Sequence, residues 1–210
     1  MEHFLLIVLW SLWCTLHSVL VSTAVTACLG RRMGAYLPYY RLLYNLFSFL
    51  TIVPVVLYGR SLQSETFFAW HGPWRIGQIL LLAGAGILFV GGSRHYSPGQ
   101  FLGIRQIQEG ESCALLREDC DITSSGLLGV LRHPWYAGAI LLIWARPLNS
   151  GALLTNLVLT AYLVIGAYLE ERKLLQAFGE AYRTYQQKVS MFIPWKWVRS
   201  NIWSRLFWKA

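Results

Sequence analysis

Long apolar runs are the feature that most constrains how this chain folds. Three of them, at about residues 4–29, 40–58 and 74–92, are long enough to cross a bilayer as helices. Over half of the residues (55%) are hydrophobic, only 13% are charged, and the mean hydropathy is +0.43. This composition excludes an ordinary soluble domain and predicts an integral membrane protein whose main partner is the lipid bilayer.

Two further apolar segments, at about residues 134–147 and 151–169, are joined by a short turn and predict a helical hairpin. The second of them continues past residue 170 into an amphipathic helix that reaches about Lys188. The tail interleaves tryptophans with basic residues, which is typical of a helix in the headgroup region. We therefore predict an all-α membrane bundle of about five transmembrane helices with a cytosolic C-terminal amphipathic helix.

No repeat, low-complexity segment or flexible linker divides the sequence, so we predict one membrane domain over residues 1–210. Its expected parts are three N-terminal spans (1–92), a cytosolic loop (93–133), the hairpin with the helix that follows it (134–194) and an interfacial tail (195–210).

The basic residues predict the orientation of this bundle. With five spans, all but three of the 18 lysines and arginines fall on one side of the membrane, the exceptions being Arg60, Arg75 and Arg146. The positive-inside rule then places the N-terminus outside and the C-terminus in the cytosol. Membrane orientation also explains the net charge of +8, so we expect no nucleic-acid partner.

The four cysteines do not predict a metal centre. Cys14, Cys28, Cys113 and Cys120 include no close pair such as Cys-x-x-Cys, and we expect no metal ion.

A polar stretch with nitrogen-rich side chains, residues 131–138, lies at the start of the fourth predicted span. Arg132 offers a fixed fork of donors, and His133 holds or releases a proton near neutral pH. Pro134 suits the first turn of a helix, whose N-terminus favours an anionic ligand. The alternative is a basic helix flank in which Arg132 meets lipid headgroups.

A second stretch downstream completes a recognisable series. Glu170-Glu171 is followed by Phe178-Gly179, Tyr182, Tyr185, Val189 and Ile193-Pro194. Together with Arg132-His133-Pro134-Trp135-Tyr136-Ala137-Gly138, this series resembles the C-terminal half of the isoprenylcysteine carboxyl methyltransferase and phospholipid methyltransferase superfamily. The resemblance covers roughly residues 123–194.

Two positions depart from that pattern. Leu128 replaces a frequent tyrosine, and Gly166 stands where prenylcysteine enzymes often carry an arginine. The sequences of residues 101–106 and 162–166 resemble more closely those of the small bacterial branch of the superfamily, which includes thiol S-methyltransferases and NnrU-type proteins. We therefore expect a protein of the bacterial inner membrane.

The resemblance implies S-adenosylmethionine as methyl donor and a small or lipophilic acceptor: a thiol, a prenylcysteine carboxylate or a lipid amine. The residues that it implies for the cofactor site are Arg132, His133, Pro134, Tyr136, Gly138, Glu170, Glu171 and Tyr182. For the two glutamates, the alternative is a solvated start of a helix.

The catalytic residue is not assigned by the sequence, and the candidates are His95, Arg105 and His133. A polar stripe of His17, Ser18, Asn45 and Ser48 on the first two spans is expected to bind an acceptor that enters laterally. Such a stripe equally suits the packing of one helix against another.

Two other functions stay open from the sequence. One is a non-enzymatic NnrU-type protein of a haem or redox pathway, with His17, His95 and His133 as axial ligands. The other is a membrane reductase that uses NADPH. The identity of the acceptor and the oligomeric state are open as well.

The predicted orientation is tested by cysteine labelling in a cysteine-free background. A membrane-impermeant reagent added from outside is expected to label a cysteine at Asn149 and to miss one at Ser112, because the two fall on opposite sides in the five-span topology. The reverse labelling pattern would contradict the orientation.

Overall fold

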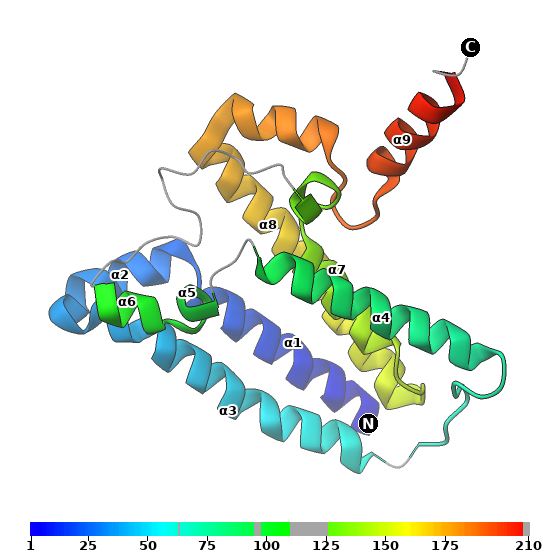
Figure 1. Cartoon of the computed structure of the whole chain (residues 1–210). Coiled ribbons are helices and arrows are strands. Elements are labelled where there is room, and N and C mark those ends of the chain that lie inside the picture. Colours follow the sequence, from blue (N-terminus) through cyan, green and yellow to red (C-terminus); the bar gives the residue numbers. More distant parts are fainter. Residues whose placement is uncertain (63, 95–97, 110–125, 208–210) are drawn as a thin grey trace. The chain divides into compact units, whose positions relative to one another are not determined.

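The computed structural model describes residues 1–62, 64–94, 98–109 and 126–207, and these are mostly helical (Figure 1). The elements in chain order are α1 (Glu2–Leu20), α2 (Thr23–Met33), η1 (Gly34–Tyr39), α3 (Tyr40–Ser61), α4 (Trp74–Ser93), α5 (Pro98–Leu102), α6 (Ile104–Glu109), η2 (Gly126–Gly129), α7 (Pro134–Trp144), α8 (Ser150–Lys188) and α9 (Trp195–Phe207). Within the described ranges there are only two isolated β-bridges and no strand, which confirms the all-α prediction.

Four helical stretches are long and apolar enough to cross a membrane: Glu2–Leu20, Thr23–Ser61, Trp74–Ser93 and Ser150–Lys188. A shorter apolar helix, α7, has 11 residues. It rises only about 16 Å, roughly half the thickness of a hydrocarbon core. The fourth predicted span is therefore shorter than expected from residues 134–147, because Pro147 disfavours helical geometry just before it.

The first span is also shorter than the sequence predicted. The apolar run of residues 4–29 is split between α1 and α2 at Val21-Ser22. The Ser22 hydroxyl donates to the Val19 carbonyl oxygen (2.7 Å) and accepts from the Val25 N–H (3.4 Å). A serine that bonds to the backbone on both sides ends one helix and caps the next.

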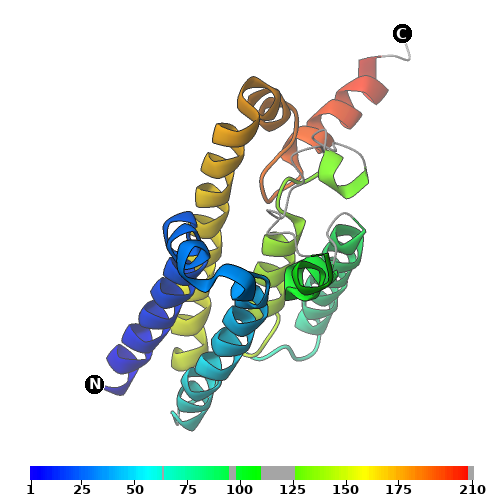
Figure 2. The same cartoon turned by 90° about the vertical axis from the view of Figure 1, so that its left-hand side faces the viewer.

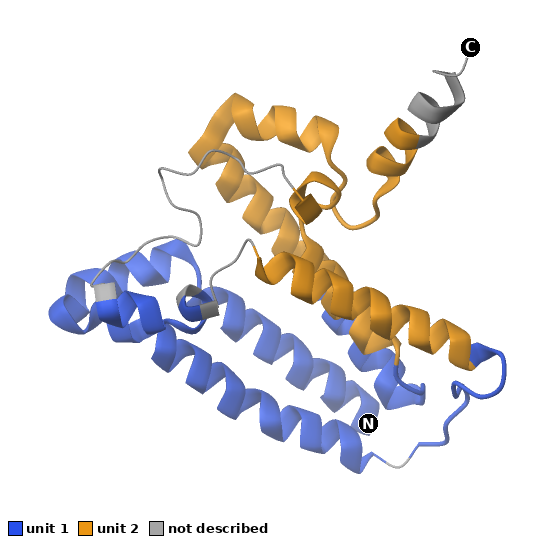
Figure 3. Cartoon of the chain, in the orientation of Figure 1, with its two compact units in different colours: residues 1–74, 96–118, 146–162 blue, residues 75–95, 119–145, 163–210 orange. Residues whose placement is uncertain are grey.

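The chain divides into two compact units, which Figure 3 colours separately. Unit 1 comprises residues 1–74, 96–118 and 146–162, and unit 2 comprises residues 75–95, 119–145 and 163–210. The long helix α8 contributes its first part to unit 1 and its remainder to unit 2.

The core of unit 1 forms where α1 and α3 run side by side, as both views show (Figures 1 and 2). Leu6, Trp10 and Val55 are buried there. The Trp13 indole N–H is shared between the Ser48 carbonyl oxygen (3.3 Å) and the Thr51 hydroxyl (3.2 Å). The two helices are thus joined by hydrogen bonds as well as by apolar packing.

In unit 2, glycines let α4 and α7 approach closely. A Cβ atom at Gly92 would lie 2.3 Å from the Trp135 ring, and one at Gly138 would lie 3.3 Å from Leu88 Cβ. The Trp135 indole donates to the Phe89 carbonyl oxygen over 3.2 Å. The missing side chain at Gly92 is therefore what makes room for Trp135.

This packing makes a testable stability prediction. Gly92→Ala should lower the melting temperature, because a new methyl group displaces a rigid indole; overpacking of this kind costs about 1–3 kcal/mol. Gly86→Ala is the matched control, since a Cβ there meets no atom within 4 Å. Thermal unfolding of both variants in detergent checks the prediction, and equal melting temperatures would contradict it.

Candidate functional site

The Arg-His-Pro stretch forms the turn that precedes α7 in unit 2. Pro134 is the first residue of α7, where its missing N–H leaves no bond unmade. The Arg132 N–H donates to the Ser190 carbonyl oxygen (2.9 Å), and the His133 N–H donates to the Met191 carbonyl oxygen (3.2 Å). The turn is thus paired through its backbone with the segment that follows α8.

That segment reaches the turn because α8 bends sharply near its end. Gly179 has φ +55° and ψ −127°, a left-handed conformation that favours glycine. Beyond the bend, Tyr182, Tyr185 and Val189 form a buried apolar cluster. The Tyr185 hydroxyl donates to the Leu128 carbonyl oxygen over 2.6 Å, which fastens the returning chain to residues just before the turn.

A buried ion pair lies inside this loop. Arg132 Nε is 2.6 Å from Glu171 Oε1, and the two side chains are only 9% and 8% exposed. Arg132 Nη1 donates to the carbonyl oxygens of Gln186 and Val189. The Gln186 amide donates in turn to Glu171 Oε2 over 2.8 Å. These bonds close a ring between the Arg-His-Pro turn and both sides of the bend in α8.

The two adjacent glutamates have different environments around His133. His133 Nε2 lies 3.2 Å from Glu171 Oε1, whereas Nδ1 lies 3.8 Å from Glu170 Oε2. The Glu170 side chain is 32% exposed, four times as much as that of Glu171. The Glu171 carboxylate is used in the buried ring of hydrogen bonds. The Glu170 carboxylate is partly exposed, so a ligand can reach it.

Electrostatics hold Glu171 ionised. Burial by itself would raise the pKa of Glu171, but hydrogen bonds from His133 and Arg132 and the charge of Arg132 outweigh it and lower the pKa to about 2. Burial raises the pKa of Tyr185 to about 12, with Arg132 opposing the rise, so its hydroxyl remains a donor at neutral pH. Burial raises the pKa of Tyr182 as well.

Among the other residues expected at a cofactor site, Tyr136 lies beside the ring of hydrogen bonds around Arg132 and Glu171. Its aromatic ring meets that of His133 edge-on, with centroids 5.4 Å apart, and a Cβ at Gly166 would lie 3.5 Å from it. Gly138 faces α4, and Tyr182, only 3% exposed, packs within the apolar cluster. Unit 2 therefore gathers Arg132, His133, Pro134, Tyr136, Glu170 and Glu171 at the turn, and uses Gly138 and Tyr182 in packing.

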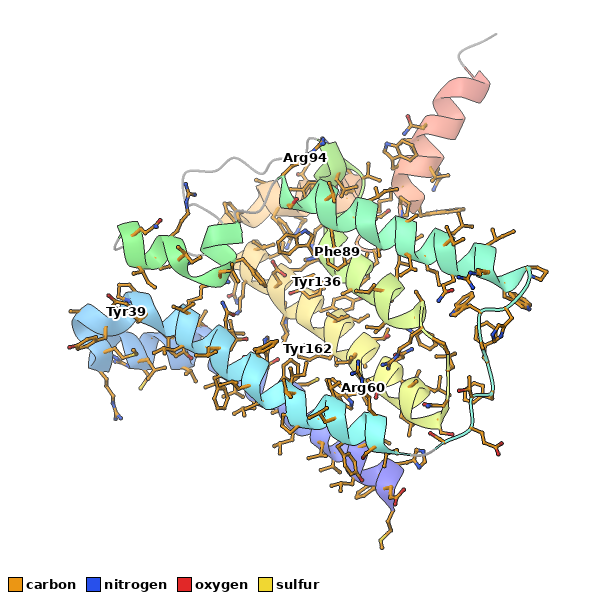
Figure 4. The ribbon with its side chains drawn as sticks, turned by 60° about the horizontal axis from the view of Figure 1, so that its bottom comes forward. Tyr39, Arg60, Phe89, Arg94, Tyr136 and Tyr162 are labelled. Carbon is orange, nitrogen blue, oxygen red and sulfur yellow. The ribbon has the colours of Figure 1, made fainter. Side chains whose placement is uncertain are left out.

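The residues expected on the acceptor side lie in unit 1, where His17 is held between two tyrosines. The Tyr44 hydroxyl is 2.6 Å from Nε2 of His17, and the Tyr162 hydroxyl is 2.6 Å from Nδ1 (Tyr162 is labelled in Figure 4). The Trp13 ring lies over the imidazole at 5.0 Å between centroids. Tyr162 is not predicted by the polar side of the first two spans, because it lies on a later helix, α8.

The rest of the predicted polar stripe takes part in helix packing. The Asn45 amide donates to the carbonyl oxygens of Phe101 and Leu102, both at 3.1 Å, and so holds α5 against α3. Ser48 is buried, and its carbonyl oxygen accepts from Trp13. Ser18 lies near Tyr162. The stripe therefore has the packing role, and lateral entry of an acceptor beside it stays a prediction.

The two catalytic candidates among the described residues belong to different units. Arg105 is exposed on α6 in unit 1, and His133 is buried in unit 2. His95 lies outside the described residues.

Comparison with known proteins identifies relatives of a part of the chain. It is 49% identical over 67 residues to methanethiol S-methyltransferase 1 of Bradyrhizobium diazoefficiens, covering 31% of this chain and 24% of that protein. Identity is 43% over 72 residues to methanethiol S-methyltransferase of a Pseudomonas species (34% and 28% covered) and 41% over 66 residues to that of Mycobacterium tuberculosis (31% and 27% covered).

The chain thus spans about a quarter of the length of the curated relatives that it matches. No solved structure matches the chain significantly. The model of the family described as NnrU protein, in contrast, matches residues 5–200, which is nearly the whole sequence. The chain therefore belongs to the NnrU family.

Proposed function

We propose that this protein is an S-adenosylmethionine-dependent membrane methyltransferase that methylates a small thiol. The observation that carries the proposal is the 49% identity over 67 residues to a methanethiol S-methyltransferase. The arrangement of unit 2 supports it, because an accessible carboxylate and an aromatic ring lie beside a rigid, buried ion pair.

The residues at the Arg-His-Pro turn fit the chemistry of this cofactor. When bound, S-adenosylmethionine supplies an electrophilic methyl group on a sulfonium. The Glu170 carboxylate would accept from the amino group or the ribose hydroxyls, and the Tyr136 ring would face the sulfonium charge. Among the described residues, Arg132 donates from Nε and Nη1, and Nη2 would meet the methionyl carboxylate.

In this proposal Arg132 and Glu171 are mainly positioning residues. Their ring fixes the start of α7 and the bend of α8, so that Glu170 and Tyr136 are held in place before a ligand arrives. Prior ordering of this kind lowers the entropic cost of aligning the reactants.

A thiol acceptor sets one chemical requirement. Methyl transfer would form a carbon–sulfur bond to the acceptor, break the methyl–sulfonium bond of the donor and release the thiol proton, so a polar group is needed near an otherwise apolar acceptor. Of the residues expected on the acceptor side, His17 would take this role only by exchanging its hydrogen bond to Tyr44 or Tyr162 for one to the thiol. Ser18, Asn45 and Ser48 would help to shape its surroundings.

The haem alternative is less well supported by the geometry. Both ring nitrogens of His17 lie 2.6 Å from a tyrosine hydroxyl, and those of His133 face Glu171 and Glu170. An imidazole engaged on both sides has no nitrogen free for iron without rearrangement. Spectroscopy of the purified protein separates the functions: a Soret band indicates haem, and NADPH binding indicates a reductase.

The two glutamates should respond differently to neutralisation. Glu170→Gln should weaken S-adenosylmethionine binding about 10- to 150-fold, because a charged hydrogen bond is worth about 1.5–3 kcal/mol. Glu171→Gln should instead lower the melting temperature, since an unpaired buried Arg132 costs about 3 kcal/mol. Isothermal titration calorimetry and thermal unfolding measure the two effects.

Glu180→Gln is the matched control, because Glu180 pairs with Arg183 in a solvent-exposed bridge on the same helix. It should change neither quantity. Equal binding by wild type and Glu170→Gln would remove Glu170 from the proposed cofactor site.

The lowered pKa of Glu171 also predicts how stability depends on pH. A carboxyl group with a folded pKa of about 2, against an ordinary value of 4.5, stabilises the fold fully above that ordinary value. The contribution is lost as the pH falls through this window. Melting temperatures measured from about pH 6 to about pH 3 should fall less steeply for Glu171→Gln than for wild type. Parallel slopes would contradict the assigned pKa.

A further inference from the structure

Two of the three arginines that depart from the positive-inside pattern lie together in unit 1. Arg60 lies near the end of α3 (Figure 4), and Arg146 lies in the connection before α8. A Cβ atom at Gly151 would lie 3.7 Å from the Gly59 carbonyl oxygen, so the end of α3 packs against the start of α8. The two guanidinium groups are thus carried by elements in direct contact.

Arg146 is held firmly in this place. Its Nε and Nη2 both donate to Asn156 Oδ1, over 3.0 and 2.6 Å, and Nη2 also donates to the Ala152 carbonyl oxygen over 3.1 Å. Its own carbonyl oxygen accepts from the Trp70 indole over 3.1 Å. The side chain is therefore oriented before any ligand binds, although it remains exposed.

The positive charge at this point is not balanced by the described part of the chain. Burial lowers the pKa of Arg146, and the nearby charge of Arg60 lowers it further. Among the described residues, neither arginine lies within 4.0 Å of a carboxylate. This holds even for Glu2, whose carbonyl oxygen accepts from Tyr58, two residues before Arg60. Two close cations without an acidic partner favour an anion.

A buried amide and the start of a helix lie beside Arg146. Asn156 is 0% exposed, and its amide nitrogen has no acceptor among the described residues, although its oxygen is bonded to Arg146. The first turn of α8 lies next to it, where Asn149 caps the Ala152 N–H over 2.7 Å. The positive end of a long helix adds to the attraction for an anion.

Aromatic side chains favour a position of this end of unit 1 at the level of lipid headgroups. Phe68 meets the rings of Trp70 and Trp74 edge-on, with centroids 4.9 and 6.2 Å apart. Tryptophans gather where a membrane meets water, which is also where phospholipid phosphates lie. An anion at Arg60 and Arg146 would therefore have oxygen atoms at the depth of the phosphate layer.

From these contacts we propose that Arg60 and Arg146 form a binding site for a phosphate group, either that of a phospholipid headgroup or a free phosphate. Arg60 would offer paired N–H donors that match phosphate oxygens, and Arg146 would add the N–H groups of Nη1, since its Nε and Nη2 are held by Asn156. Arg146 is the fixed partner and Arg60, which donates no hydrogen bond to another described side chain or carbonyl, is the adjustable one. The site is independent of the proposed methyltransferase activity.

Thermal unfolding of the detergent-purified full chain tests the site. Three probes are titrated separately: phosphatidylglycerol, sodium phosphate against sodium chloride of equal ionic strength, and a diacylglycerol without phosphate. We expect a phosphate-bearing probe to raise the melting temperature, with its apparent Kd weakened about tenfold or more by Arg60→Gln. Stabilisation by the lipid alone identifies a headgroup, and stabilisation by sodium phosphate identifies a soluble anion.

Arg75→Gln is the matched control, because Arg75 is an exposed arginine predicted on the same membrane side, at the start of α4. It should leave the apparent Kd unchanged. Arg60→Lys keeps the positive charge but not the paired N–H donors of the guanidinium, so it should weaken binding less than Arg60→Gln. It also serves as the test if Arg60→Gln does not fold. Equal effects of the substitutions at Arg60 and Arg75, or stabilisation by none of the phosphate-bearing probes, would overturn the proposal.

Discussion

The buried ion pair between Arg132 and Glu171 is the interaction on which the structure of unit 2 depends. A charge pair with side chains 9% and 8% exposed has a large desolvation cost, which is offset only when its remaining donors and acceptors are satisfied. Gln186 and the Val189 carbonyl oxygen supply those partners, and they reach the pair only because α8 bends at Gly179. The buried ion pair therefore needs the bend of α8 for its hydrogen-bond partners, and the bent segment is held in place by the ion pair.

This dependence explains why residues far apart in the sequence belong to one pattern. Tyr182, Tyr185 and Val189 pack the returning segment, and Tyr185 fastens it to Leu128. A glycine is needed at the bend because φ is positive there. Much of the resemblance to membrane methyltransferases thus consists of residues that build the turn, with Glu170 beside it as the accessible acid.

Apolar length and helical spacing were sufficient to predict the all-α membrane class, and the motif identified the residues at the Arg-His-Pro turn. The break at Ser22 was missed because hydropathy does not record a side chain bonded to the backbone on both sides. Spacing did not separate Glu170 from Glu171 either, since their difference lies in burial. Tyr162 was missed because its partner, His17, lies 145 residues away in the sequence.

The central claim is that this NnrU family member transfers a methyl group to a small thiol, and it is tested most directly by the product. Detergent-purified protein is incubated with isotope-labelled S-adenosylmethionine and methanethiol, and the headspace is analysed by gas chromatography. The account predicts dimethyl sulfide that carries the label, formed in proportion to the protein added. A folded preparation that forms no labelled product while a purified methanethiol S-methyltransferase does so under the same conditions would contradict it.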